Sequence, residues 1–228
     1  MKKIVSLFAM FFLCISIFAQ KDVTKFLGIP VDGSKTQMRQ KLIAKGYTLK
    51  RNGKDEYFSG EFNGYDVYIR IVTTNNKVSR IMVADAETLN EANIKIRFNN
   101  LVDQFKNNKR YLSLSDQSIA EDVNIQFEQL VNKKNFDAIF YQKPETDNLD
   151  KNKIQEQVMK ELLTKFTEEE IKSNSEQVQT EKSIIQIRMA SDLLTKKVVW
   201  FRISELGGGY YISMFYDNEY NRANGEDL

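Results

Sequence analysis

The sequence predicts an α+β fold in which antiparallel meander sheets pack against amphipathic helices. Runs with alternating apolar and polar residues gather in two blocks, 47–83 and 183–216, and stretches with apolar residues at helical spacing precede each block. Grouped strands are typical of an α+β fold, whereas a βαβ protein alternates strands with helices. The repeated order predicts two similar lobes: an N-terminal α+β lobe at 20–142, and a C-terminal helix plus meander at 143–228.

The first 19 residues have the pattern of a secretory signal peptide. Lys2 and Lys3 precede an uncharged stretch from Ile4 to Phe18, and Ala19 offers a small residue at the break. The stretch is shorter than the ~20 residues of a bilayer span. We therefore expect export, cleavage near Ala19, a periplasmic or secreted location, and no transmembrane span in the mature form.

Residues 34–83 predict one helix followed by a sheet. Ser34 and Gln37 form a capping box, and Gly46 follows as a natural stop, so a helix is expected over Lys35–Lys45. Turn sequences such as Asn63-Gly64 then separate alternating runs. The expected strands are Tyr47–Lys50, Glu56–Phe62, Tyr65–Val72 and Val78–Val83.

Capping boxes also open two further predicted helices. The one at Thr88 precedes a helix to about Lys106, and the one at Ser118 precedes a helix over Ile119–Asn132. A strand is expected at Asn135–Tyr141, since Phe136, Ala138 and Phe140 alternate with other residues.

The last third of the chain predicts a linker, a long helix and a three-stranded meander. The linker is Lys143–Asp150, the helix runs from about Leu149 to Ile171, and Ser173–Glu181 is expected to be a loop. The strands are Ser183–Met189, Val198–Glu205 and Tyr210–Tyr216, each with two-residue alternation. Gly207-Gly208-Gly209 suits a hairpin turn.

Composition excludes several chemistries from the mature chain. Its only cysteine, Cys14, lies in the predicted signal, and the chain has no histidine. Disulfides, Cys/His zinc sites and Ser–His–Asp nucleophiles therefore cannot form. Without Lys2 and Lys3, 31 of the 33 basic residues remain against 31 acidic ones, so no general attraction to nucleic acid is expected. The prediction includes no cofactor and no metal.

The candidate binding residues lie at the end of the last predicted strand. Tyr210, Tyr216 and Tyr220, with Trp200 nearby, could form an aromatic platform because such side chains combine an apolar body with a polar tip. Asp217 and Asn218 add polar groups beside it. The alternative is that these aromatic residues pack in the core or across strands.

Paired carboxylates offer the one open catalytic alternative. Glycoside hydrolysis needs two acids about 5–10 Å apart. Candidates stand at predicted strand edges and turns: Asp55, Glu56, Glu61 and Asp66. The spacing of Asp217, Glu219 and Asn221 is similar to that of the first calcium-loop ligands. Arg222 stands where that loop requires glycine, so calcium is not expected.

Two resemblances accompany these patterns. The segment Phe26–Gly33 and the ending from Tyr216 to Leu228 resemble small exported proteins of Gram-negative gut bacteria with no assigned activity. The order of helix and meander at 35–83 is similar to the lobes of β-lactamase-inhibitor-like proteins. That resemblance implies binding of another protein through a sheet.

The function hypothesis is a non-enzymatic exported protein that binds a protein, peptide or glycan across a sheet face. The alternatives are a carboxylate-based glycoside hydrolase and a structural component of the envelope.

Overall fold

The computed structural model describes residues 22–145 and 151–223, and its architecture is α+β. The predicted signal peptide, its cleavage position and the start of the Leu149–Ile171 helix lie outside the described residues. In those ranges no helix is both long enough and apolar enough to cross a membrane.

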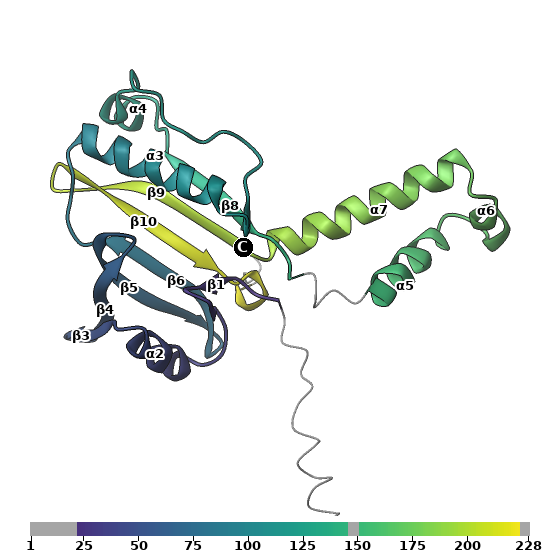
Figure 1. Cartoon of the computed structure of the whole chain (residues 1–228), viewed down its shortest axis with the longest axis horizontal. Coiled ribbons are helices and arrows are strands. Elements are labelled where there is room, and N and C mark those ends of the chain that lie inside the picture. Colours follow the sequence, from purple (N-terminus) through teal and green to yellow (C-terminus); the bar gives the residue numbers. More distant parts are fainter. Residues whose placement is uncertain (1–21, 146–150, 224–228) are drawn as a thin grey trace, which may run out of the picture.

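An eight-stranded antiparallel sheet forms the centre of the molecule (Figure 1). Its strand order is β3-β4-β5-β6-β10-β9-β8-β7. The bounds are β3 Thr48–Asn52, β4 Asp55–Phe62, β5 Tyr65–Thr74, β6 Lys77–Asp85, β7 Tyr111–Leu112, β8 Asp137–Gln142, β9 Val198–Leu206 and β10 Gly209–Asp217. A separate hairpin joins β1 Lys25–Phe26 to β2 Ile29–Pro30.

The element order repeats in the two halves of this sheet. Helix α2 (Lys35–Ala44) precedes the meander β3–β6, and helix α3 (Glu91–Asn107) precedes β7–β10. The halves join where β6 pairs antiparallel with β10, for example Val83 opposite Met214. The second half contains two insertions: helix α4 (Ile125–Leu130) before β8, and the helices α5 (Lys151–Leu162), α6 (Glu168–Ser173) and α7 (Glu176–Thr195) between β8 and β9.

Local sequence explains the first half well. Ser34 and Gln37 form the predicted capping box at the start of α2. Asn63 and Gly64 both have positive φ, +58° and +79°, as a tight turn between β4 and β5 requires. The predicted strands of this half are all present, with ends within two residues of those predicted.

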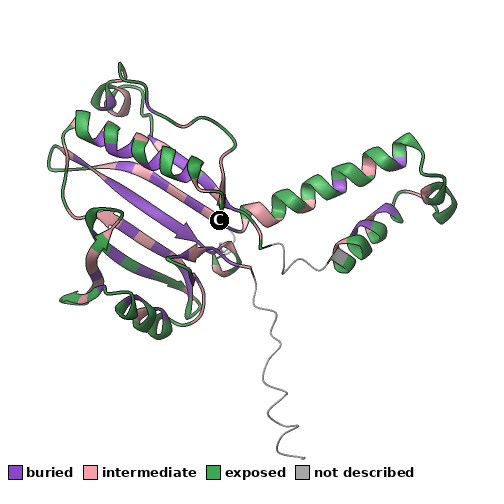
Figure 2. Cartoon of the chain, in the orientation of Figure 1, coloured by how far each residue is buried: buried purple, intermediate pink, exposed green. Residues whose placement is uncertain are grey.

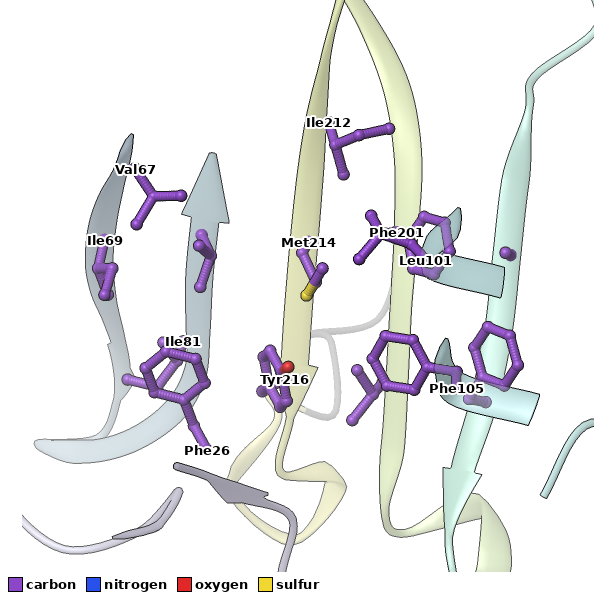
Figure 3. Packing of buried hydrophobic residues seen from close by; sticks show 14 of the residues in the cluster. Phe26, Val67, Ile69, Ile81, Leu101, Phe105, Phe201, Ile212, Met214 and Tyr216 are labelled. Atoms are coloured by element: carbon purple, nitrogen blue, oxygen red, sulfur yellow. The ribbon is translucent and has the colours of Figure 1, made fainter. Parts of the chain in front are cut away.

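Helices α2 and α3 bury one face of the sheet. Met38 and Leu42 of α2, and Ile94, Phe98 and Leu101 of α3, belong to one apolar cluster with the sheet. Figure 3 shows Leu101 and Phe105 lying against Phe201, while Phe26 and Tyr216 meet beside Ile81. The ring centroids of Phe26 and Tyr216 are 4.8 Å apart.

The prediction of a strand at Ser183–Met189 is wrong, because these residues lie inside α7. So is the predicted loop over Ser173–Glu181, where α7 begins at Glu176 with Ser175 as its cap. Ile185 is buried, but Ile187, two residues on, is 70 % exposed. Helix α7 packs on α5 through Ile185, Val158 and Leu162.

Three other helix predictions need correction. The helix predicted to reach Ile171 ends at Leu162, and Thr167 caps a new one, α6, through its own capping box with Glu170. The cap of α3 is Asn90 rather than Thr88.

The helix predicted over Ile119–Asn132 contains only α4, capped by Asn124. Side chains of α3 bind the backbone before it. Asn99 exchanges two hydrogen bonds of 2.8 Å with the backbone of Ile119, and Lys95 donates to the carbonyls of Glu121 and Val123. Those groups are therefore satisfied without a helix.

Figure 2 shows the consequence of this arrangement: the strands of the sheet centre are buried, whereas α5 and α7 extend away from the sheet and are exposed along most of their length. We call residues 151–195, which contain these helices, the helical arm.

Candidate functional site

The face of the sheet opposite α2 and α3 is the candidate site, and we call it the open face. Side chains alternate along each strand, so the neighbours of the buried residues point to this side. Tyr68, Val72 and Ile139 on it are 44 %, 42 % and 42 % exposed. Its members come from six strands, β4, β5, β6, β10, β9 and β8, so only the folded sheet brings them together.

An apolar row crosses the centre of the open face. The strand register places Met82 opposite Phe215, Phe215 opposite Trp200, and Trp200 opposite Ile139. The rings of Trp200 and Phe215 stack with centroids 4.0 Å apart and an angle of 20°. Cross-strand aromatic pairs of this kind fix each other's orientation.

Two ion pairs hold arginines against this row. Arg80 donates to Asp217, with a 2.8 Å bond from Nη2 to Oδ2, and its guanidinium lies 5.0 Å from the ring centre of Phe215. The hydrogen bond with Asp217 raises the pKa of Arg80 despite partial burial. Arg202 pairs with Asp137 at 2.9 Å and lies 5.2 Å from the ring centre of Trp200.

Asp217 connects the two parts of the site. Its Oδ2 also accepts a 2.9 Å hydrogen bond from Nε1 of Trp200. One carboxylate therefore orients both the indole and the guanidinium of Arg80, and the indole needs no other partner for its N–H. The centre of the open face is ordered before anything binds to it.

The rim towards β4 is less constrained. Tyr57 and Tyr68 meet edge to face with centroids 5.2 Å apart. Arg70 is exposed and only reaches Asp55 at 3.9 Å, a weak surface pair.

The five predicted binding residues do not gather on this face. Tyr210 and Tyr216 are buried and point to the covered face with Ile212 and Met214. Asp217 is on the open face, as described. The sequence predicts Trp200 as a platform member but not Met82, Arg80 or Phe215, because both faces of β10 carry aromatic residues and alternation alone does not say which face the helices cover.

Asn218 and Tyr220 lie in the segment after β10, which hydrogen-bonds to the backbone that follows β2 and to β6. Asn218 is buried, and its side chain donates to the carbonyl of Val31 at 2.7 Å and accepts from the backbone N–H of Tyr220 at 3.0 Å. Asn221 similarly donates to Asp32 and to the carbonyl of Val78. Tyr220 is partly exposed, 5.9 Å from the Lys196 ammonium.

Two of the four carboxylates considered for catalysis, Asp55 and Glu56, are in ion pairs. Glu56 accepts from both Arg39 nitrogens at 2.9–3.1 Å, and Arg51 approaches it at 3.6 Å. Glu61 and Asp66 are cross-strand neighbours on β4 and β5. Across residues 22–145 and 151–223, no three acidic side chains come together in a way that could hold a metal ion.

Comparison with known proteins finds no matching family model, no matching curated protein and no matching solved structure. The residue types and contacts of the open face are therefore the basis for its function.

Proposed function

We propose that the chain is an exported protein-binding module and that the open face is its interface. The observation that carries this proposal is the row Met82–Phe215–Trp200–Ile139 with Arg80 and Arg202 held against it. Tryptophan, tyrosine, methionine and arginine are the residue types enriched at protein interfaces, and buried anchors of these types provide most of the binding free energy.

Preorganisation supports the same proposal. Binding normally costs about 0.5–1.5 kcal/mol for each long side chain that becomes ordered. Arg80 and Arg202 already form ion pairs, and Trp200 already donates to Asp217. A partner therefore gains contact with these side chains without having to order them.

A protein fits this face better than a glycan does. Sugars bind aromatic side chains by lying on a free ring face. The Trp200 indole is stacked on Phe215, and guanidinium groups of Arg80 and Arg202 lie 5.6 and 5.2 Å from its ring centre. A nucleic acid is also disfavoured, because these two arginines are neutralised by Asp217 and Asp137.

Export rests on the N-terminal residues alone: Lys2 and Lys3, the uncharged stretch to Phe18, and Ala19. It places the expected partner among periplasmic, outer-membrane or extracellular proteins.

The test compares an exposed isoleucine on the open face with an exposed isoleucine on helix α3, which covers the opposite face. Ile139 on the open face and Ile96 on α3 are 42 % and 59 % exposed, so replacing either with aspartate leaves the core intact. The immobilised chain is incubated with envelope proteins of the producing cells and, separately, with a glycan array. We expect one stoichiometric protein partner, bound about thirtyfold more weakly by Ile139→Asp, as for a central contact worth about 2 kcal/mol. Ile96→Asp should bind like the wild type.

The proposal would be abandoned if Ile139→Asp bound the partner as well as the wild type, or if Ile96→Asp lost it to the same extent. A specific glycan bound by the wild type and lost in Ile139→Asp would assign the face to sugars instead. A matched variant on the helical arm, Ile187→Asp, tests whether the exposed apolar residues of the arm bind the partner instead.

A further inference from the structure

A pocket of about 850 Å³ lies on the covered side of the sheet, away from the open face. It is formed by the C-terminal end of α3, the β1–β2 hairpin, and strands β7 and β8, with β10 as its floor. This volume is within the range of small-ligand sites, roughly 300–1,000 Å³. The apolar part of its wall consists of Leu27, Phe62, Leu101, Phe105, Met214 and Tyr216.

Tyr216 presents its hydroxyl to this pocket. The side chain is 4 % exposed, its ring is fixed against Phe26, and Figure 3 shows it beside Met214. Within the described residues no hydrogen bond of its hydroxyl is found, and Arg97 Nε is the only fully buried side-chain polar atom there without a partner, so the Tyr216 oxygen is accessible from the pocket. Burial raises the pKa of Tyr216 well above its usual value, so the hydroxyl keeps its proton and remains a donor.

Tyr111 provides a second donor at the same wall. Its oxygen accepts a 3.0 Å hydrogen bond from Nε2 of Gln142, and that amide is itself fixed by the backbone of Lys25 at 2.7 and 2.8 Å. In the described part of the chain, the proton of the Tyr111 hydroxyl has no acceptor. Two hydroxyls at one wall that can each donate suit a ligand that carries an acceptor group.

The rim of the pocket is cationic. Five basic side chains line it against one acid, Glu145: Lys25, Lys109, Arg110, Lys143 and Lys197. Lys25 pairs with Glu145, and Lys197 pairs with Asp22 at 2.6 Å. The other three have no carboxylate partner among the described residues. Such an excess of positive charge attracts an anion to the pocket.

We propose that this pocket binds a small carboxylate with an apolar tail. The tail contacts Leu101, Phe105 and Met214, and the carboxylate accepts hydrogen bonds from the hydroxyls of Tyr111 and Tyr216 with Arg110 at the rim. This site is separate from the open face and does not depend on its function.

The first experiment measures binding of decanoate to the purified chain by titration calorimetry, with 1-decanol as the uncharged match. We expect one saturable site for decanoate and at least about tenfold weaker binding of 1-decanol, because a hydrogen bond to a charged group contributes about that factor. Octanoate and 4-phenylbutyrate test the length and shape of the tail.

Variants then locate the site. Tyr216→Phe removes only the hydroxyl and should weaken decanoate binding by about tenfold. Tyr210→Phe is the matched control, since Tyr210 is on the same strand and the same face but outside the pocket wall. Arg110→Gln tests the exposed rim without touching the core and should also weaken the carboxylate but not 1-decanol.

The proposal is overturned if none of the three carboxylates binds at concentrations up to about 1 mM, the weakest affinity useful for a specific site. It is equally overturned if 1-decanol binds as tightly as decanoate, or if Tyr216→Phe and Arg110→Gln both bind like the wild type. Near-ultraviolet circular dichroism of each variant confirms that it is folded.

Discussion

The sheet and the helical arm of this protein are built on very different amounts of buried surface. The sheet with α2 and α3 shares one continuous cluster of 30 buried apolar side chains. The arm holds its helices together through three buried side chains, Val158, Leu162 and Ile185, with four partly buried ones around them. Since apolar burial is the main favourable term in folding, the arm should open far more readily than the sheet.

The arm also enters and leaves the sheet at one place. Strand β8 leads into it and β9 follows it, and these strands pair directly, with Tyr141 opposite Val198. The backbone N–H of Gln142 donates to the carbonyl of Lys197 at 2.9 Å. The pairing of β8 with β9 therefore continues up to the point where the arm begins and ends. The sheet can stay folded when the arm opens, so the two parts can differ in stability.

The largest expected effect is that of Phe201→Ala in the sheet. Phe201 is fully buried and its ring contacts Phe98, Phe105 and Phe140 at centroid distances of 5.0 to 6.0 Å. Removing it should lower the free energy of unfolding by about 3–5 kcal/mol. Urea unfolding monitored by Trp200 fluorescence measures this, and a loss below about 1 kcal/mol would mean that the two regions do not differ as argued.

The corresponding change in the arm is Ile185→Ala. It should cost about 2–4 kcal/mol, but within the arm alone. Hydrogen exchange should become fast for the amides of α5 and α7, while those of β6, β9 and β10 keep their protection. Equal acceleration in both regions would show that the arm and the sheet unfold as one unit.

The third prediction is that the stability of the sheet, but not that of the arm, depends on tyrosine ionisation at high pH. Tyr216 is in the sheet, and the arm residues 151–195 include no tyrosine. Burial raises the pKa of Tyr216 in the folded state, so its contribution to stability is complete below pH 10. Above pH 10 the unfolded chain ionises first, and stability falls by about 1.4 kcal/mol per pH unit for this one proton.

Urea unfolding between pH 9 and 11 measures that slope. Tyr216→Phe should reduce that slope, because it removes the ionisable hydroxyl whose pKa is raised. An identical slope in the wild type and Tyr216→Phe would show that Tyr216 does not cause the loss of stability above pH 10.

The smallest effects are expected at the two capping boxes, one in each region. Ser34→Ala at the start of α2 should lower global stability by about 1 kcal/mol, since α2 packs on the sheet through Met38 and Leu42. Thr167→Ala at the start of α6 should expose only the amides of that helix to exchange and leave the unfolding midpoint of the sheet unaffected. A shift of that midpoint by Thr167→Ala would contradict the independence of the arm.

The sequence alone determined the α+β class and most of the first half of the chain. The turns at Asn63-Gly64, the capping box at Ser34 and the alternation of Val67, Ile69 and Ile71 depend on neighbours in sequence, so local chemistry specifies them. The sequence also predicted binding residues at the end of the last strand, and one of them, Asp217, lies on the open face.

Only the tertiary structure decided between helix and strand at Ile185–Met189. Residues i and i+4 share a face in both a helix and a strand, and Ile185 and Met189 both pack against the α5 side of the arm. The residue between them, Ile187, decides the period, and its exposure depends on a helix that is distant in sequence.

Contacts between distant segments also decide which residues of β10 belong to the open face. Both faces of β10 carry buried aromatic residues, and the packing of α2 and α3 on one side of the sheet determines that Tyr216 lies in the core, whereas Phe215, 9 % exposed, stacks with Trp200 on the open face. Burial is set by contacts between distant segments, so no local pattern can assign it.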